Sequence, residues 1–88
     1  MRILDQWSTA DIPYDSACIY RDEGNIIAYL PAAAGNNLKI LLAEYSDMDK
    51  AKAAMKKLRI AYQRSLNAID VAFGQFTEYF QFPQEADL

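Results

Sequence analysis

The side chains that most often carry out enzyme chemistry are nearly absent from this chain. Its 88 residues contain no histidine and a single cysteine, Cys18. Without histidine the chain lacks the commonest general base, the usual partner of a serine or cysteine nucleophile, and the usual zinc ligand. One cysteine is too few to build a thiolate metal site. The sequence therefore predicts no histidine-dependent catalytic residues and no metal ligands.

The remaining polar motifs lead to the same expectation. The three glycines lack the spacing of a phosphate-binding loop. Asp47 and Asp49 resemble the start of a calcium loop, but neither the glycine nor the closing glutamate of such a loop follows. Asp22 and Glu23 are adjacent in a predicted turn, where exposed acids are normal. Catalysis by carboxylates alone stays open as an alternative, but we expect no enzyme and no cofactor.

Length and composition indicate one small globular domain, residues 1–88, that is 52% hydrophobic and 24% charged. Cys18 lies in a strand-like run and is expected to be a buried, inert thiol, as in proteins of a reducing cytoplasm. The longest nearly apolar run, 26–34, contains Pro31 and is far shorter than the ~20 residues that span a bilayer. Asp5 precedes any apolar stretch that could serve as an export signal. We expect a cytoplasmic location and no membrane contact.

Hydrophobic periodicity predicts the elements. Strands are expected near residues 2–6, 17–21, 26–30, 38–45 and 77–82, with a polar loop between the first two. The short connections, such as the turn at 22–25, imply antiparallel pairing, and the last strand is expected to run antiparallel to an earlier one. The predicted fold is α+β: an antiparallel sheet of four to five strands, a meander plus a C-terminal strand, packed by one long helix.

The helix is expected to begin after Ser46, which is placed as its N-cap, and to continue to at least residue 64. Its apolar stripe extends to Phe73, and Gly74 is the first plausible C-cap. A helix over 47–73 would be ~40 Å long, whereas a six-residue strand covers only ~20 Å. Either the helix breaks near Ser65, or its second half extends beyond the sheet; we favour the second possibility.

The same patterns predict which residues form the core and which do not. The acidic segment 84–88 is expected to be frayed. The expected core residues are the apolar side chains on the inner faces of the strands and helix, namely Ile3, Cys18, Tyr20, Ile27, Leu38, Ile40, Leu42, Met55, Leu58, Tyr62, Phe80 and Phe82.

The apolar stripe beyond the predicted reach of the sheet is the candidate surface for self-association. It comprises Leu66, Ile69, Phe73 and Phe76, which recur at helical spacing. A chain of this length also gains stability from a partner surface, because its own core is small. The sequence therefore predicts a homodimer that uses these four residues.

A basic band is the second candidate surface. Residues 50–64 contain six basic side chains and no acid, although the whole chain has a net charge of −3. Lys52, Lys56 and Arg59 share one helix face and could contact phosphate groups. The alternative is the solvated side of an amphipathic helix. Because the chain is acidic, with a pI of about 4.7, we favour the solvated face and expect no nucleic-acid binding.

Several short blocks occur together in a familiar order: 1–4, 11–14, 43–46, the helix residues Ala51, Ala54, Met55, Leu58, Arg59 and Tyr62, and finally 79–83. This order resembles a group of small, uncharacterised proteins encoded in prophages and mobile elements of Gram-positive bacteria. Many members of that group carry a longer segment before the final strand, where this chain has only residues 63–78. The resemblance implies a bacterial, cytoplasmic, phage-linked protein and no particular activity.

Together these observations lead to one expected function and one alternative. We expect a small non-enzymatic accessory protein that acts through protein–protein contact and self-association. The alternative is a nucleic-acid-binding accessory protein that uses the basic helix 50–64. An exposed apolar aromatic patch would favour the first reading, and a convex basic ridge would favour the second.

Overall fold

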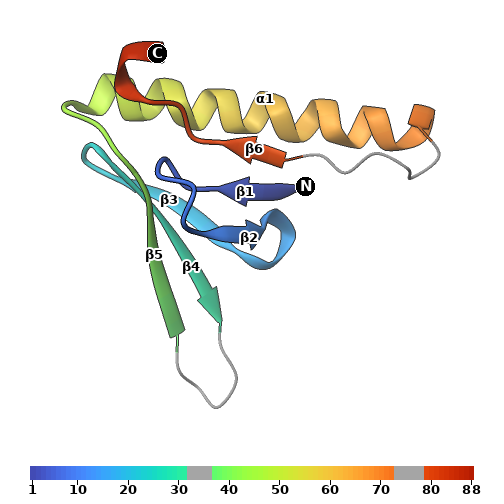
Figure 1. Ribbon diagram of the computed structural model, residues 1–88, viewed down its shortest axis with the longest axis horizontal. Coiled ribbons are helices and arrows are strands. Elements are labelled where there is room, and N and C mark those ends of the chain that lie inside the picture. The colour runs from blue at the N-terminus through green and yellow to red at the C-terminus, as the bar shows by residue number, and fades with distance from the viewer. Residues whose placement is uncertain (32–36, 73–78) are drawn as a thin grey trace.

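The computed structural model describes residues 1–31, 37–72 and 79–88, with the side chains of residue 37 and residues 67–72 left undescribed. The fold is α+β, as predicted from the sequence (Figure 1). Its elements, in chain order, are β1 (Arg2–Leu4), β2 (Asp11–Pro13), the 3-10 turn η1 (Tyr14–Ser16), β3 (Cys18–Asp22), β4 (Asn25–Pro31), β5 (Asn37–Glu44), α1 (Met48–Ala72), β6 (Tyr79–Gln81) and the 3-10 turn η3 (Glu85–Asp87).

The strands form two three-stranded sheets instead of the single sheet expected. One is the predicted antiparallel meander, in the order β3-β4-β5. The other has the order β2-β1-β6 and contains β2, which the sequence analysis assigned to a polar loop. The prediction that the last strand is antiparallel is wrong, because β6 pairs with β1 in parallel. A long helix precedes β6, and crossovers of this kind connect parallel strands.

Gln6 joins the two sheets where β1 meets the edge of β5. Its backbone N–H donates to the carbonyl oxygen of Leu42 at 2.7 Å, and its side-chain oxygen accepts from the backbone N–H of Glu44 at 3.0 Å. Leu42 is the extra residue of a β-bulge, because Ile26 pairs with Ala43 while Ile27 pairs with Leu41. The buried side chain and backbone of Gln6 therefore hydrogen-bond the two sheets to each other.

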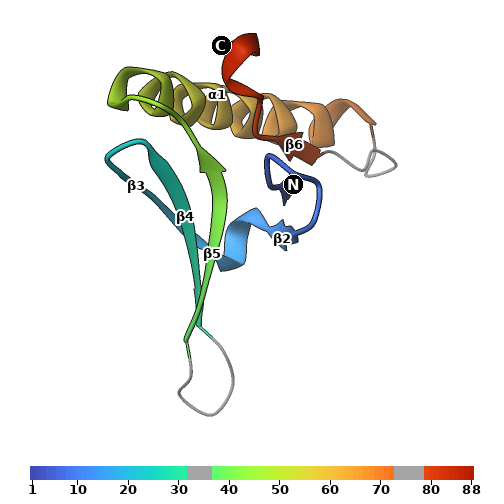
Figure 2. The same cartoon turned by 60° about the vertical axis from the view of Figure 1, so that its left-hand side comes forward.

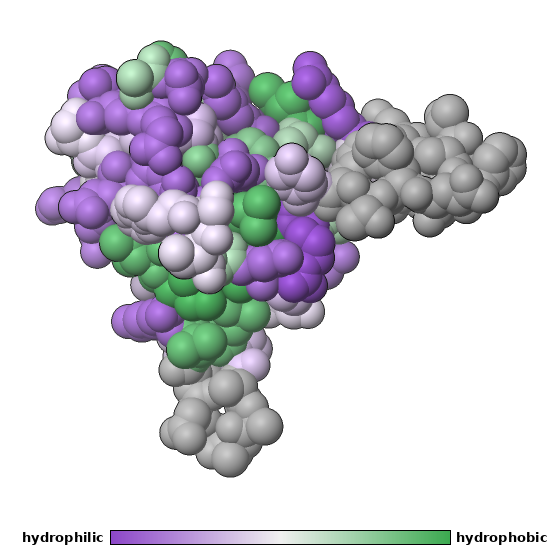
Figure 3. All heavy atoms as spheres, viewed as in Figure 1, coloured by the Kyte–Doolittle hydropathy of each residue, from purple (hydrophilic) through white to green (hydrophobic). Residues whose placement is uncertain are grey.

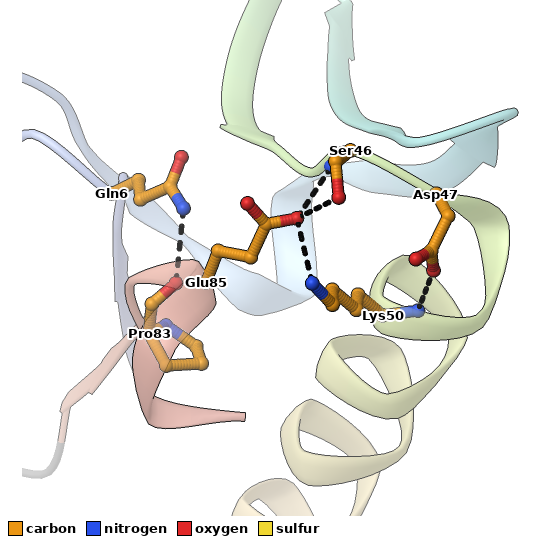
Figure 4. A network of polar contacts seen from close by, with 6 residues as sticks. All are labelled: Gln6, Ser46, Asp47, Lys50, Pro83 and Glu85. Carbon is orange, nitrogen blue, oxygen red and sulfur yellow. Dashed lines mark hydrogen bonds and ion pairs between the residues drawn. The ribbon is translucent and has the colours of Figure 1, made fainter.

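The helix continues through Ser65, so the alternative of a break there is wrong. Ser46 is not the N-cap. Asp47 occupies that position, and its carboxylate accepts from the amide of Lys50 at 2.9 Å (Figure 4). The Ser46 amide and hydroxyl both donate to Glu85 instead, so the serine binds the C-terminal segment of the chain.

The second sheet lies beside the part of α1 that was expected to extend past a single sheet. In both ribbon views β6 runs alongside the second half of the helix (Figures 1 and 2). Ser65 is accordingly only 3% exposed, whereas Leu66 on the next position is 48% exposed. The helix is therefore continuous, as favoured from the sequence, but the expectation of a single sheet was wrong, because a second sheet of the same chain lies beside its second half.

The core forms between α1 and the two sheets. Of the twelve predicted core residues, four are fully buried: Ile3, Leu42, Leu58 and Phe82. Three more, Ile40, Met55 and Phe80, are partly buried and pack against the core, whereas the partly buried Tyr20, Ile27 and Tyr62 are not in that set, so their prediction as core residues is wrong. The predictions for Cys18 and Leu38 are wrong, because both are exposed. The far end of the β4–β5 hairpin projects away from the helix, so an apolar side chain there can face solvent (Figure 1).

The C-terminal segment is packed, so the prediction that residues 84–88 are frayed is wrong. Glu85 accepts hydrogen bonds from Ser46 and forms an ion pair with Lys50 at 3.3 Å (Figure 4). The side chain of Leu88 packs against the core. These contacts attach the end of the chain to the junction between β5 and α1.

Candidate interaction surfaces

The first candidate surface is the face of the β3-β4-β5 sheet that points away from α1, which we call the outer face. Strand register places Tyr20, Ile27 and Leu41 on it in a central row, with Cys18, Tyr29 and Lys39 in the row on one side and Asp22, Asn25 and Glu44 in the row on the other. The central row is uncharged, whereas Lys39 in one flanking row and Asp22 and Glu44 in the other carry charges. Hydrophobic atoms gather over the β4–β5 hairpin in the space-filling view (Figure 3).

The outer face is separate from the core. Leu41 is 41% exposed, and Tyr20, Ile27 and Tyr29 are only partly buried. Among the described residues, these partly buried side chains are not in the set that packs against the buried core. An apolar patch of this kind on a soluble domain marks a surface that contacts something else.

The second candidate surface is a groove between α1 and β3, which we call the α1–β3 groove. Its larger hollow has a volume of about 410 Å³ and is lined by Tyr14, Asp15, Ala17, Ile19, Met55, Leu58 and Arg59. An adjoining hollow of about 280 Å³ is lined by Arg21, Lys52, Met55 and Arg59. Because Met55 and Arg59 line both, the two hollows form one continuous groove.

The two ends of the α1–β3 groove differ in charge. At one end the ring of Tyr62 stacks on Tyr14 at 4.2 Å, and its hydroxyl donates to Asp15 at 3.3 Å. The charge of Asp15 raises the pKa of Tyr62, so that tyrosine stays a neutral donor. At the other end stand Arg21 and Lys52. The groove is therefore acidic at the end near η1 and basic at the end near Asp22.

The structure brings together only part of each set of site residues predicted from the sequence. Lys52, Lys56 and Arg59 are all exposed, but Lys56 does not line the groove. The sequence analysis missed Arg21, because no local pattern connects a strand residue with a helix that follows much later in the chain. Of the predicted self-association residues, Leu66 is exposed, whereas Phe73, Phe76 and the side chain of Ile69 lie outside the described part of the structure.

Among the described residues, the one buried carboxylate has a structural role. Asp5 is 2% exposed and accepts from the Thr9 amide at 2.7 Å, the Thr9 hydroxyl at 2.6 Å and the Ala10 amide at 3.1 Å. Burial alone would raise the pKa of Asp5, but these hydrogen bonds outweigh it and hold the pKa below the usual value of 3.8. Its oxygens are thus committed to the loop between β1 and β2.

Comparison with known proteins adds no relative: no family model, no curated protein and no solved structure matches the chain. Within residues 1–31, 37–72 and 79–88, no group of three or more acids and cysteines could hold a metal ion. No helix in this part of the chain is long and apolar enough to cross a membrane.

Proposed function

We propose that this protein is a small non-enzymatic accessory protein that acts through protein–protein contact, and that its first partner is a second copy of itself. The observation that carries the proposal is the outer face. Five of the six residues in the Tyr20 and Cys18 rows are uncharged, and Leu41 in the central row is 41% exposed. Burying apolar area of this kind contributes about 25 cal/mol per Å², so leaving it in water is costly.

A second copy is the occupant that fits the outer face best. The charges of the face, Lys39 on one side and Asp22 and Glu44 on the other, flank its central apolar row, and Lys39 stands at the β5 edge. A two-fold axis through the centre of the face would set each lysine at the rim, where water reaches it, and bring the apolar rows together. A small domain with a limited core gains stability from such a partner surface.

The non-enzymatic part of the proposal rests on the residues available for chemistry. The chain has no histidine, and the carboxylate of Asp5 is occupied by three hydrogen bonds. A cytoplasmic, phage-linked setting is part of the proposal as well, and it is supported only by the sequence resemblance described above. Sequencing the genes that flank this one in its host tests that setting directly.

Sedimentation velocity at micromolar concentration tests the dimer. The wild-type chain should sediment as a dimer, and the double variant Ile27→Glu/Leu41→Glu should sediment as a folded monomer, because two charges per copy would be buried in the interface. Ile60→Glu is the matched control, since Ile60 is a similarly exposed apolar residue, at 39%, but belongs to α1. Circular dichroism establishes that each variant is folded.

The single cysteine gives an independent measurement. Cys18 is exposed on the outer face, so its alkylation by a maleimide should slow as the protein concentration rises and the dimer forms. The rate in the double variant should not depend on protein concentration. A wild-type chain that remains monomeric, with a concentration-independent alkylation rate, would show that the proposal is wrong.

Nucleic-acid binding, the alternative function, has weaker support. The three exposed bases of the predicted face do not form one ridge, because Lys52 and Arg59 line a groove, whereas Lys56 does not. Asp15 lies in the same groove and would repel a phosphate backbone.

A further inference from the structure

The α1–β3 groove runs along an unpaired strand edge. In the order β3-β4-β5, β3 pairs only with β4 among the described strands, so its other edge presents backbone groups with no strand partner there. Figure 2 shows β3 at the outside of the sheet, with α1 crossing above it. An edge strand of this kind is a template for another chain in β conformation.

The side chains of β3 that face the helix alternate in character along the groove. Ile19 lines the larger hollow together with Leu58, and Arg21 lines the smaller one together with Lys52. Two positions along a strand correspond to about 7 Å. A paired strand would therefore place one side chain in the apolar hollow and the next side chain on the same face beside the cations.

We propose that the α1–β3 groove binds an extended acidic peptide segment of another protein, which adds to the outer edge of β3 as a further strand. An apolar side chain of the segment fills the hollow beside Ile19 and Leu58. One or two carboxylates, two and four residues away on the same face, pair with Arg21, Lys52 and Arg59. The site uses the opposite face of the sheet from the proposed dimer interface, so neither proposal depends on the other.

Two features favour a peptide over a nucleic acid as the occupant. Backbone amides and carbonyls along the β3 edge can form a ladder with a polypeptide, whereas a sugar–phosphate chain cannot reproduce that spacing. The charge of the groove also changes sign along its length, from Asp15 to Arg21. A polyphosphate would meet the acid at one end, but a peptide can carry its carboxylates at the basic end only.

The test uses the full chain labelled with nitrogen-15 and two blocked hexapeptides, Thr-Val-Thr-Glu-Thr-Glu and its reverse, Glu-Thr-Glu-Thr-Val-Thr. One of the two should shift the amide resonances of Cys18–Asp22 in a saturable way, and the one that binds reports the strand direction. The same peptide with lysine in place of glutamate should bind at least about tenfold more weakly, because like charges are brought together at the basic end.

Backbone methylation separates strand addition from simple charge attraction. A paired strand forms its ladder bonds through every second residue. Of two peptides methylated on alternate amide nitrogens, one should therefore lose binding and the other should keep it. If both methylated peptides bind as well as the parent, strand addition is wrong.

Charge variants complete the test. Arg59→Glu should weaken the acidic peptide about three- to tenfold, in line with the small energies of exposed ion pairs, and should strengthen the lysine peptide. Lys57→Glu is the matched control, because Lys57 is an exposed neighbour on α1 that does not line the groove. Failure of both parent peptides to bind would overturn the proposal. Tighter binding of a ten-nucleotide thymidine strand to the same amides would also overturn it, in favour of a phosphate ligand.

Discussion

The phenolic hydroxyl of Tyr45 donates a 2.8 Å hydrogen bond to the carbonyl oxygen of Pro83, which connects the residue after β5 to the C-terminal segment. The same carbonyl accepts from the side-chain amide of Gln6 at 3.1 Å (Figure 4). One backbone oxygen thus gathers three parts of the chain that are far apart in sequence. Burial, with a contribution from the charge of Glu85, raises the pKa of Tyr45 to about 12.

Tyr45→Phe should lower the free energy of unfolding by about 1 kcal/mol at pH 7, the usual contribution of one hydrogen bond. The pKa of Tyr45 is higher in the folded state than its ordinary value of 10, so this stabilisation is complete below pH 10 and is lost as pH rises towards 12. In urea unfolding, the free energies of unfolding of the wild type and of Tyr45→Phe should therefore converge above pH 10. A difference that stays constant to pH 12 would contradict this role of the hydroxyl.

Gly24→Ala should destabilise the fold by about 2 kcal/mol, within the range observed for overpacking. A Cβ at this position would lie 2.3 Å from the backbone carbonyl oxygen of Tyr45, an atom that cannot turn aside as a flexible side chain would. The neighbouring substitution Glu23→Gly should have the opposite sign, a gain of about 0.5 kcal/mol, because Glu23 has a φ of 54°. Thermal unfolding of both variants measures these two changes in stability. If the two variants changed stability in the same direction, this account of Gly24 and Glu23 would be wrong.

Asp5→Asn should cost about 2 kcal/mol at neutral pH, because the amide group turns a donor towards the buried donors of Thr9 and Ala10. The folded-state pKa of Asp5 is depressed, so its contribution is present above pH 3.8 and disappears as pH falls below that value. The free energy of unfolding of the variant should therefore fall less steeply with decreasing pH than that of the wild type. Asp11→Asn is the control, since the Asp11–Arg2 ion pair is exposed and should change stability by less than about 0.5 kcal/mol.

The double variant Ile69→Glu/Phe73→Glu distinguishes the surface predicted from the sequence from the outer face. If the outer face forms the dimer, this variant should still sediment as a dimer at the concentration used for the wild type. A folded monomer would instead show that the helix residues form the interface. A variant that unfolds would assign Ile69 and Phe73 to the core of the chain itself.

Binding to duplex DNA should be undetectable at low micromolar concentration and should show no steep dependence on salt. A protein that neutralises several phosphates shows affinity that falls linearly with the logarithm of salt concentration, with a slope set by the number of phosphates. Fluorescence anisotropy between 50 and about 200 mM salt covers the range in which that slope is measured. A steep slope, lost in the variant Lys52→Ala/Lys56→Ala/Arg59→Ala, would restore the alternative function.

The parts of this fold that could be predicted are those governed by local patterns. The apolar periodicity predicted the meander β3-β4-β5 and placed the start of α1 within a residue of Met48. The pairing of β1 with β6 depends on residues at opposite ends of the described chain, and nothing local indicates it. β2 contains only three residues, one of them Pro13, so its sequence resembles a loop.

The candidate surfaces were harder to predict for a related reason. In β5 the residues from Leu38 to Leu42 are apolar at nearly every position. Hydrophobic periodicity alone therefore does not show which face of β5 packs against the core. The bulge at Leu42 then changes which side chains point to the core. The basic end of the groove depends on a strand and a helix meeting, and Arg21 acquires its neighbours only in the folded chain.

The parallel pairing of β1 with β6 also sets an order of events during synthesis. Residues 2–4 leave the ribosome well before their β6 partners at 79–81 are made. The meander and α1 can form from local contacts, whereas this pair must wait, and local contacts form faster than distant ones. Until then one edge of β1 stands open on a nascent chain, where it can pair with a neighbouring molecule. Slow translation of the codons for residues 79–81 should therefore increase aggregation of this protein.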